Sequence, residues 1–233
     1  RQTVLADGIY LDWLVSGTLW TIATSLSAWA IALVGGAVLG VLLTVPNRLA
    51  RLLAQAYVEL FRNVPLIVQL FLWYFVAPEL LPAGASHWVK REMPLPEFTT
   101  AVVALGLFTA ARVAIQVAAG LNSLSRGQRN AALALGMTET QAYRYVLLPN
   151  AARIMVPTLT TEFMSIVKNS AVALTIGLFE LTAGSRSIAE STFQGFEAFT
   201  AATIIYIVLA LGADAVSGAI DRWTAIPRSD GAR

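Results

Sequence analysis

Residues 13–47 read WLVSGTLWTIATSLSAWAIALVGGAVLGVLLTVPN and contain no charged side chain. A helix needs about 20 mostly apolar residues to cross the hydrocarbon core of a bilayer. This run is longer than that, and Pro46 and Asn47 at its end are residues that favour turns. The sequence therefore predicts a first membrane span over residues 14–45.

The composition of the whole chain supports the same class. Of its 233 residues, 57% are hydrophobic and only 13% are charged, and the mean hydropathy is +0.66. Soluble domains carry about 25% charged residues, so much of this surface must face lipid. The net charge is only +2 and the basic residues are scattered along the chain. The sequence therefore shows no basic cluster of the kind that binds nucleic acid. There is no cysteine, which excludes disulfides, zinc–thiolate sites and cysteine nucleophiles.

Four further apolar stretches follow the first one. We expect spans at about 52–81, 98–121, 154–179 and 198–220, with Pro65 able to kink the second. The segments 82–97, 122–153 and 180–197 are too polar to cross a membrane. The prediction is an all-α integral membrane protein with five transmembrane helices, in which residues 1–233 form a single transmembrane domain.

The distribution of basic residues predicts the orientation. Cytoplasmic segments of membrane proteins carry an excess of Lys and Arg. Nine arginines fall on one predicted side: Arg48, Arg51, Arg126, Arg129, Arg144, Arg153, Arg222, Arg228 and Arg233. Four basic residues fall on the other side: Arg1, Lys90, Arg91 and Arg186. We therefore expect the N-terminus outside, the C-terminus inside and the 122–153 loop in the cytoplasm.

The 122–153 loop predicts two short helices. Residues 128–135 are good helix formers, and Gly136 is a natural C-terminal stop. Thr138 and Gln141 have the spacing of a capping box that starts a second helix. Pro149 should mark the break between that helix and the fourth span. The loop is thus expected to form a compact projection from the membrane.

The same loop resembles the EAA motif of ABC importer permeases. That motif has an acidic residue and two alanines, then Gly after three residues, then Ile-x-Leu-Pro after nine more. Matching positions are Ala131, Ala132, Gly136, Leu148 and Pro149, with Val146 in place of Ile and Asn130 in place of the acidic residue. The resemblance implies the type I ABC importer permease architecture. It also implies that the loop is a coupling helix that seats in a cytoplasmic ATPase.

Other stretches between residues 57 and 190 resemble the polar amino-acid permeases. They include Phe61–Phe71 in the second span and Ile166–Ser170 in the fourth. Phe108–Val113 and Pro78–Pro82 look most like the permeases for glutamate and aspartate. Glutamine or a basic amino acid is the alternative substrate.

The resemblance also implies the other members of the transporter. These are a cytoplasmic ABC ATPase dimer that binds ATP and Mg²⁺, a second permease subunit (identical or a paralogue) and a periplasmic amino-acid-binding protein. The chain contains no Gly-x-x-x-x-Gly-Lys-Ser/Thr loop, so we expect it to bind no cofactor and to hydrolyse no ATP by itself. The implied location is the bacterial inner membrane.

Charged residues within the spans are candidates for the substrate path, because charge inside a bilayer is costly and usually faces a protein interior or water. Arg62, Asn63, Arg112 and Lys168 are the candidates, and Arg112 is favoured for an acidic side chain because its own helix offers no partner. The alternative is that these residues form structural pairs, such as Arg62 with Glu59.

Two other functional classes fit the sequence poorly. A membrane enzyme would have one histidine, no cysteine and no HExxH or Gly-x-Ser-x-Gly motif to work with. We therefore predict no catalytic residue and no metal site. A secondary transporter would be expected to show an inverted repeat, which is not visible here.

Overall fold

The computed structural model describes residues 8–124 and 126–224. Within these ranges the chain is helical and contains no β-strand. The elements in chain order are α1 (Gly8–Thr44), α2 (Arg48–Asn63), α3 (Leu66–Phe71), η1 (Leu72–Val76), η2 (Ala77–Leu80), α4 (Ala83–Arg91), α5 (Pro96–Ser123), α6 (Arg126–Ala134), α7 (Glu139–Ala142), η3 (Tyr143–Leu147), α8 (Leu148–Asn169), η4 (Ser170–Ile176), α9 (Leu181–Thr192) and α10 (Gly195–Thr224).

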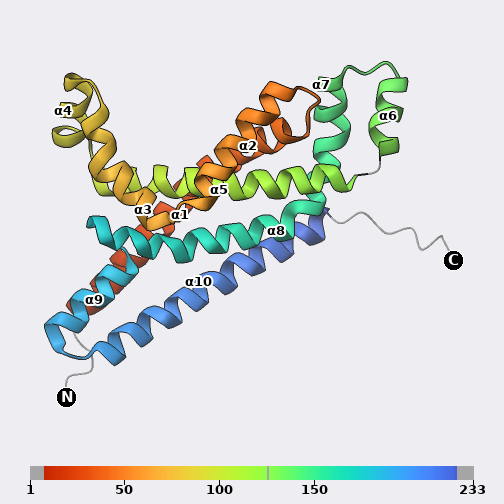
Figure 1. The fold of residues 1–233 in the computed structure, drawn as a ribbon. Coiled ribbons are helices and arrows are strands. Elements are labelled where there is room, and N and C mark those ends of the chain that lie inside the picture. Colours follow the sequence, from red (N-terminus) through yellow and green to blue (C-terminus); the bar gives the residue numbers. More distant parts are fainter. Residues whose placement is uncertain (1–7, 125, 225–233) are drawn as a thin grey trace.

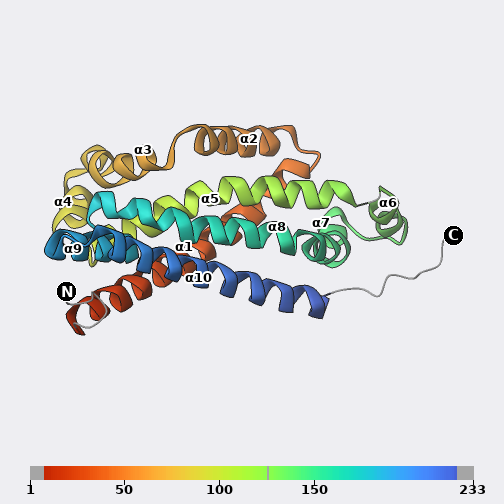
Figure 2. The same ribbon diagram turned by 90° about the horizontal axis from the view of Figure 1, so that it is seen from below.

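The long helices α1, α5, α8 and α10 form the body of the molecule (Figure 1). Helices α6 and α7 lie at one end of this body, and α4 and α9 lie at the other, in both views (Figure 2). The segment from α2 to α3 covers the α5 side, opposite α10 (Figure 2). The largest buried cluster joins α1, α5 and α8 through residues such as Ala28, Leu105 and Ile166.

Helices α1 and α5 pack closely because glycines of α1 face valines of α5. A Cβ placed on Gly36 would lie 2.5 Å from the Cβ of Val113, and one on Gly40 would lie 2.5 Å from the Cβ of Val117. Both pairs are four residues apart on their helices, so they lie on one face of each. In a membrane, helices associate through such close packing of small residues. The face of α1 that carries Gly36 and Gly40 is therefore used for helix packing.

We predict that Gly36→Ala lowers the thermal unfolding midpoint of the purified protein. The added methyl group overlaps Val113, and overpacking of this kind costs about 1–3 kcal/mol. Gly35→Ala is the matched control, since its Cβ would make an ordinary 3.5 Å contact with Ala110. Val113→Gly should recover part of the midpoint lost in the Gly36→Ala variant, because it removes the Cβ of Val113 that the added methyl group overlaps. Equal midpoints for the Gly35 and Gly36 variants would contradict the packing.

The second predicted span is not one helix. It consists of Arg48–Asn63 and Leu66–Leu80, which are bent by 102° at the break. Pro65 cannot donate a backbone hydrogen bond, and it disfavours helical geometry in the residue before it. Val64 is accordingly extended. The Gln69 amide donates to the carbonyls of Phe61 and Val64, both at 2.8 Å, which stabilises the break inside the apolar environment.

The other predicted spans match helices more closely. Gly8–Thr44, Pro96–Ser123 and Gly195–Ala219 are each long and apolar enough to cross a membrane. The fourth predicted span corresponds to α8 and η4, and the polar segment after it contains α9. Helices Glu139–Ile176 and Leu181–Thr192 are bent by 54°. The described residues therefore offer three to five crossings, the larger number counting each bent pair as one span.

Candidate functional site

The cytoplasmic loop predicted from the sequence forms a projection made of α6, α7 and η3. Helix α6 ends at Ala134, and Gly136, the predicted stop, follows in the turn with a left-handed φ of 84°. The Gly136 amide donates to the Leu133 carbonyl at 3.0 Å, and the Met137 amide donates to the Ala132 carbonyl at 3.1 Å. This pair of bonds is the Schellman motif, in which a left-handed residue satisfies the last carbonyls of a helix.

The predicted capping box of the second short helix is present. The Thr138 hydroxyl accepts from the backbone N–H of Gln141 at 3.3 Å, and the side-chain oxygen of Gln141 accepts from the backbone N–H of Thr138 at 2.8 Å. Thr138 itself is extended, as an N-cap residue should be. The two bonds fix the direction in which α7 leaves the turn after α6.

The predicted break at Pro149 is wrong. Residues 143–147 form a π-helical turn, and Leu147 and Leu148 keep helical backbone angles. The Leu148 amide donates to the carbonyl of Tyr143, five residues earlier. This turn absorbs an extra residue just before Pro149, where the proline lacks an N–H and its ring would clash with an α-helical carbonyl. The projection is therefore joined to α8 by continuous helix.

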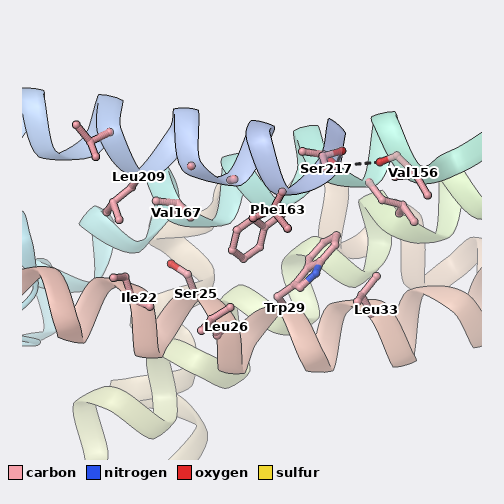
Figure 3. A pocket seen from close by; sticks show the side chains of 16 residues that line it. Ile22, Ser25, Leu26, Trp29, Leu33, Val156, Phe163, Val167, Leu209 and Ser217 are labelled. Carbon is pink, nitrogen blue, oxygen red and sulfur yellow. Dashed lines mark hydrogen bonds between the residues drawn. The ribbon is translucent and has the colours of Figure 1, made fainter. Parts of the chain in front are cut away.

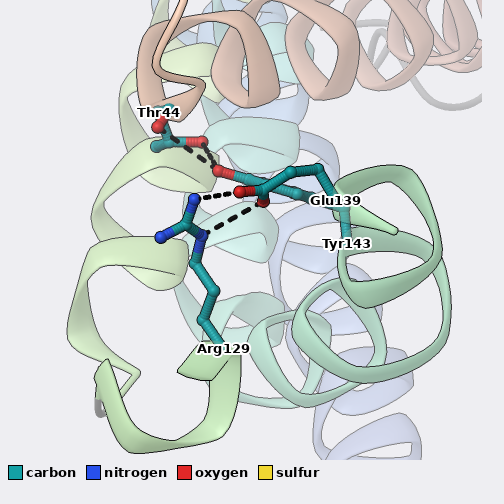
Figure 4. Close-up of polar contacts among 4 residues, drawn as sticks. All are labelled: Thr44, Arg129, Glu139 and Tyr143. Carbon is teal, nitrogen blue, oxygen red and sulfur yellow. Dashed lines mark hydrogen bonds and ion pairs between the residues drawn. The ribbon is translucent and has the colours of Figure 1, made fainter. Parts of the chain in front are cut away.

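Two polar contacts hold the projection together and attach it to α1 (Figure 4). The Arg129 guanidinium of α6 forms two hydrogen bonds with the Glu139 carboxylate of α7, one of them with an Nε–Oε2 distance of 3.2 Å. The Tyr143 hydroxyl lies 3.3 Å from both the carbonyl and the hydroxyl oxygen of Thr44, the last residue of α1. The sequence did not predict these pairs, because the members of each pair lie on different helices.

The motif residues divide into an outer and an inner set. Asn130, Ala131, Gly136 and Pro149 are exposed, Val146 and Leu148 are half-buried, and Ala132 is buried. Two large apolar side chains that the motif does not include are also exposed on the projection: Leu135 is 80% exposed and Tyr145 is 63% exposed.

A polar cavity of about 560 Å³ lies behind the projection. It is lined by residues from the ends of α1 and α5, the start of α2, and α6 and η3, including Arg51, Asn122 and Arg129. The cavity therefore lies between the projection and the ends of α1 and α5.

Arg112 has a partner on a neighbouring helix. Its Nε lies 2.7 Å from Oε2 of Glu162 on α8, and its Nη2 lies 3.5 Å from Oε1 of the same carboxylate. The Glu162 side chain is only 6% exposed, whereas that of Arg112 is 43% exposed. The pair thus joins α5 to α8 and still leaves part of the guanidinium free to meet another anion.

The other predicted path residues are not brought to this pair. Arg62 and Asn63 are exposed at the end of α2, and the Asn63 amide donates to Glu59 at 2.9 Å. Within the described residues no ion pair joins Glu59 to Arg62. Lys168 is exposed in the last turn of α8, where a positive charge is favourable.

The described residues contain no group of three or more His, Cys, Asp or Glu side chains that could hold a metal ion. Of the ion pairs that the described residues form, two lie in the elements considered above: the Arg112–Glu162 pair and the Arg129–Glu139 pair. The first lies between long helices, and the second lies in the projection.

The helices, the projection and its motif define the class of protein. Residues 32–226 match the family described as "Binding-protein-dependent transport system inner membrane component", and the chain belongs to that family. It is a component of an inner-membrane transport system.

Individual relatives agree with this family. The chain is 47% identical to the glutamate/aspartate import permease protein GltJ of Escherichia coli K12, over 100% of this chain and 96% of GltJ. It is 31% identical to the glutamate/aspartate import permease protein GltK of Escherichia coli O6:H1, over 92% of this chain and 95% of GltK. The structure described as "Crystal structure of an amino acid ABC transporter with histidines" is 30% identical, with a TM-score of 0.78, and covers 95% of this chain and 99% of that chain.

Proposed function

We propose that this chain is a permease subunit of an ATP-driven importer that moves acidic amino acids, glutamate and aspartate, into the cytoplasm. The identity of 47% with a glutamate/aspartate import permease along the whole chain is the observation that carries the proposal. The projection formed by α6, α7 and η3 supports the coupling role, and the partly exposed Arg112 guanidinium supports an anionic substrate.

In this mechanism the projection transmits the motion of an ATPase dimer that binds ATP and Mg²⁺. Closure of the ATPase moves the projection, and continuous helix from α7 through η3 carries the motion into α8. The Tyr143–Thr44 contact carries it to α1. Two permease subunits form the path, and a periplasmic binding protein delivers the amino acid. The cycle is alternating access, in which each ligand shifts an equilibrium between two states.

The proposed topology has five crossings, with the N-terminus outside and the C-terminus inside. It counts the two bent pairs as spans and places α6 and α7 on the side with excess arginine. Helices α4 and α6 lie at opposite ends of the molecule (Figure 1), which supports their placement on opposite sides of the membrane.

Labelling of single cysteines tests the topology, because the chain has no cysteine of its own. Ala85→Cys lies in α4 and Thr140→Cys lies in α7, and both positions are exposed. We expect a membrane-impermeant maleimide to label Ala85→Cys in spheroplasts and to label Thr140→Cys only after permeabilisation. Labelling of both sites from outside would contradict the orientation.

The substrate assignment is tested by identifying the ligand of the binding protein that co-purifies with this chain. We expect glutamate or aspartate to be retained on that protein and to be displaced by the other. Glutamine or arginine as the retained ligand would reassign the importer to another polar amino acid and leave the permease role in place.

A further inference from the structure

A largely apolar groove lies between α1, α8 and α10 (Figure 3). Its volume is about 670 Å³, and its lining includes Leu26, Trp29, Leu159, Phe163, Val208 and Leu209. Ser25, Thr160 and Ser217 are the polar side chains of the serine and threonine type in the lining, and no charged residue is among the lining residues described. Thr160 and Ser217 hydrogen-bond to each other. The groove therefore does not suit a zwitterionic amino acid, which would leave its charges unpaired.

The length of the groove matches one leaflet of a membrane. Its lining runs from Ile22 to Leu33 on α1 and from Val156 to Val167 on α8. Eleven helical steps span about 16–17 Å, and one leaflet of the hydrocarbon core is about 15 Å thick. An acyl chain is an apolar occupant of this length, and it has no polar group that the lining would leave unpaired.

A basic side chain marks one end of the groove. Arg153 lies one helical turn before Val156 and two turns before Thr160, so it extends the lining face of α8. It is exposed, and within the described residues no ion pair engages it. Arg222 stands in the last turn of α10, beyond Ser217 at the same end. In the proposed orientation this end meets the cytoplasmic leaflet, whose anionic lipids attract basic residues at the membrane surface.

We propose that this groove binds one acyl chain of an anionic phospholipid whose headgroup phosphate pairs with Arg153. The acyl chain fills the space between α1, α8 and α10, and the headgroup remains at the membrane surface. The bound lipid would then be a structural component of the bundle, in a place separate from the Arg112–Glu162 pair. The lipid site does not depend on which amino acid is transported.

Trp29 in the groove provides a direct probe, because brominated acyl chains quench tryptophan fluorescence on contact. The transporter, purified with its co-purifying subunits, is titrated in detergent with brominated phosphatidylglycerol or brominated phosphatidylcholine. The contribution of Trp29 is obtained by comparison with Trp29→Phe. We expect saturable Trp29-dependent quenching by phosphatidylglycerol and a loss of that preference in Arg153→Gln, whereas Arg48→Gln on α2 should keep it.

Gly212 allows the groove to be filled without disturbing the fold, because a Cβ at this position would meet no atom within 4 Å. We expect Gly212→Leu to abolish the Trp29-dependent quenching, whereas Ala215→Leu, at an exposed position of α10 outside the lining, should leave it unchanged. Mass spectrometry of the intact complex should show retained phosphatidylglycerol that Arg153→Gln loses. Equal quenching by the two lipids, equal effects of the Gly212 and Ala215 variants, or no Trp29-dependent quenching in the complex would each overturn the proposal. The last result would indicate that a partner subunit covers the groove.

Discussion

Gly136→Val is expected to uncouple ATP hydrolysis from transport. Gly136 has a φ of 84° at the end of α6, and a β-branched residue is strongly disfavoured at such an angle. A Cβ there would meet no atom within 4 Å, so the effect comes from the backbone alone. Strain of about 1–3 kcal/mol is the size of a typical coupling free energy, which corresponds to about 5–150-fold. We expect the number of amino acids transported per ATP hydrolysed to decrease by about 5- to 150-fold.

Gly136→Asn is the matched control for this prediction. Asparagine adopts left-handed angles more readily than other residues with a side chain, so it should keep most of the coupling. The assay compares ATPase activity with and without loaded binding protein, and uptake is measured on the same preparations. Full stimulation and normal uptake in Gly136→Val would show that the turn after α6 takes no part in coupling.

Arg112→Gln is expected to reduce uptake of glutamate and aspartate by about 10- to 100-fold. A hydrogen bond to a charged group contributes about 1.5–3 kcal/mol, and 1.4 kcal/mol corresponds to a factor of ten. If the importer also transports glutamine, that uptake should change less, because the glutamine side chain carries no charge. Arg112→Lys keeps the charge but not the planar pair of donors, and we expect it to fall between the wild type and Arg112→Gln.

The Arg112→Gln variant also leaves Glu162 buried without its partner, which is destabilising by itself. The double variant Arg112→Gln with Glu162→Gln separates the two effects, because both charges are removed together. We expect the double variant to recover thermal stability but not acidic amino-acid uptake. Recovery of uptake together with stability would indicate that Arg112 serves only to pair with Glu162.

Much of the fold could be predicted because its signals are local. Uncharged runs identify α1 and α10, and Gly136, Thr138 and Gln141 predict the end of α6 and the start of α7. The 102° bend between α2 and α3 could not be predicted in size. Pro65 indicates a kink but not its angle, and the side chain of Gln69 supports the break by hydrogen bonds to backbone carbonyls.

The candidate site depended more on contacts between distant residues. Arg112 and Glu162 are 50 residues apart in the sequence, and no periodicity within one helix can pair them. The same holds for Tyr143 and Thr44, which are 99 residues apart. At Pro149 the general rule predicts a break, but a π-helical turn gives the backbone another way to accommodate the ring.

Uptake into proteoliposomes tests the central claim most directly. This chain is purified with its associated ATPase and permease subunits and reconstituted with ATP and Mg²⁺ inside the vesicles, and the loaded binding protein is added outside. We predict that radiolabelled glutamate accumulates only when both ATP and the binding protein are present, and that unlabelled aspartate competes with it. Accumulation without ATP, or no accumulation of either amino acid by an ATPase-active complex, would contradict the account.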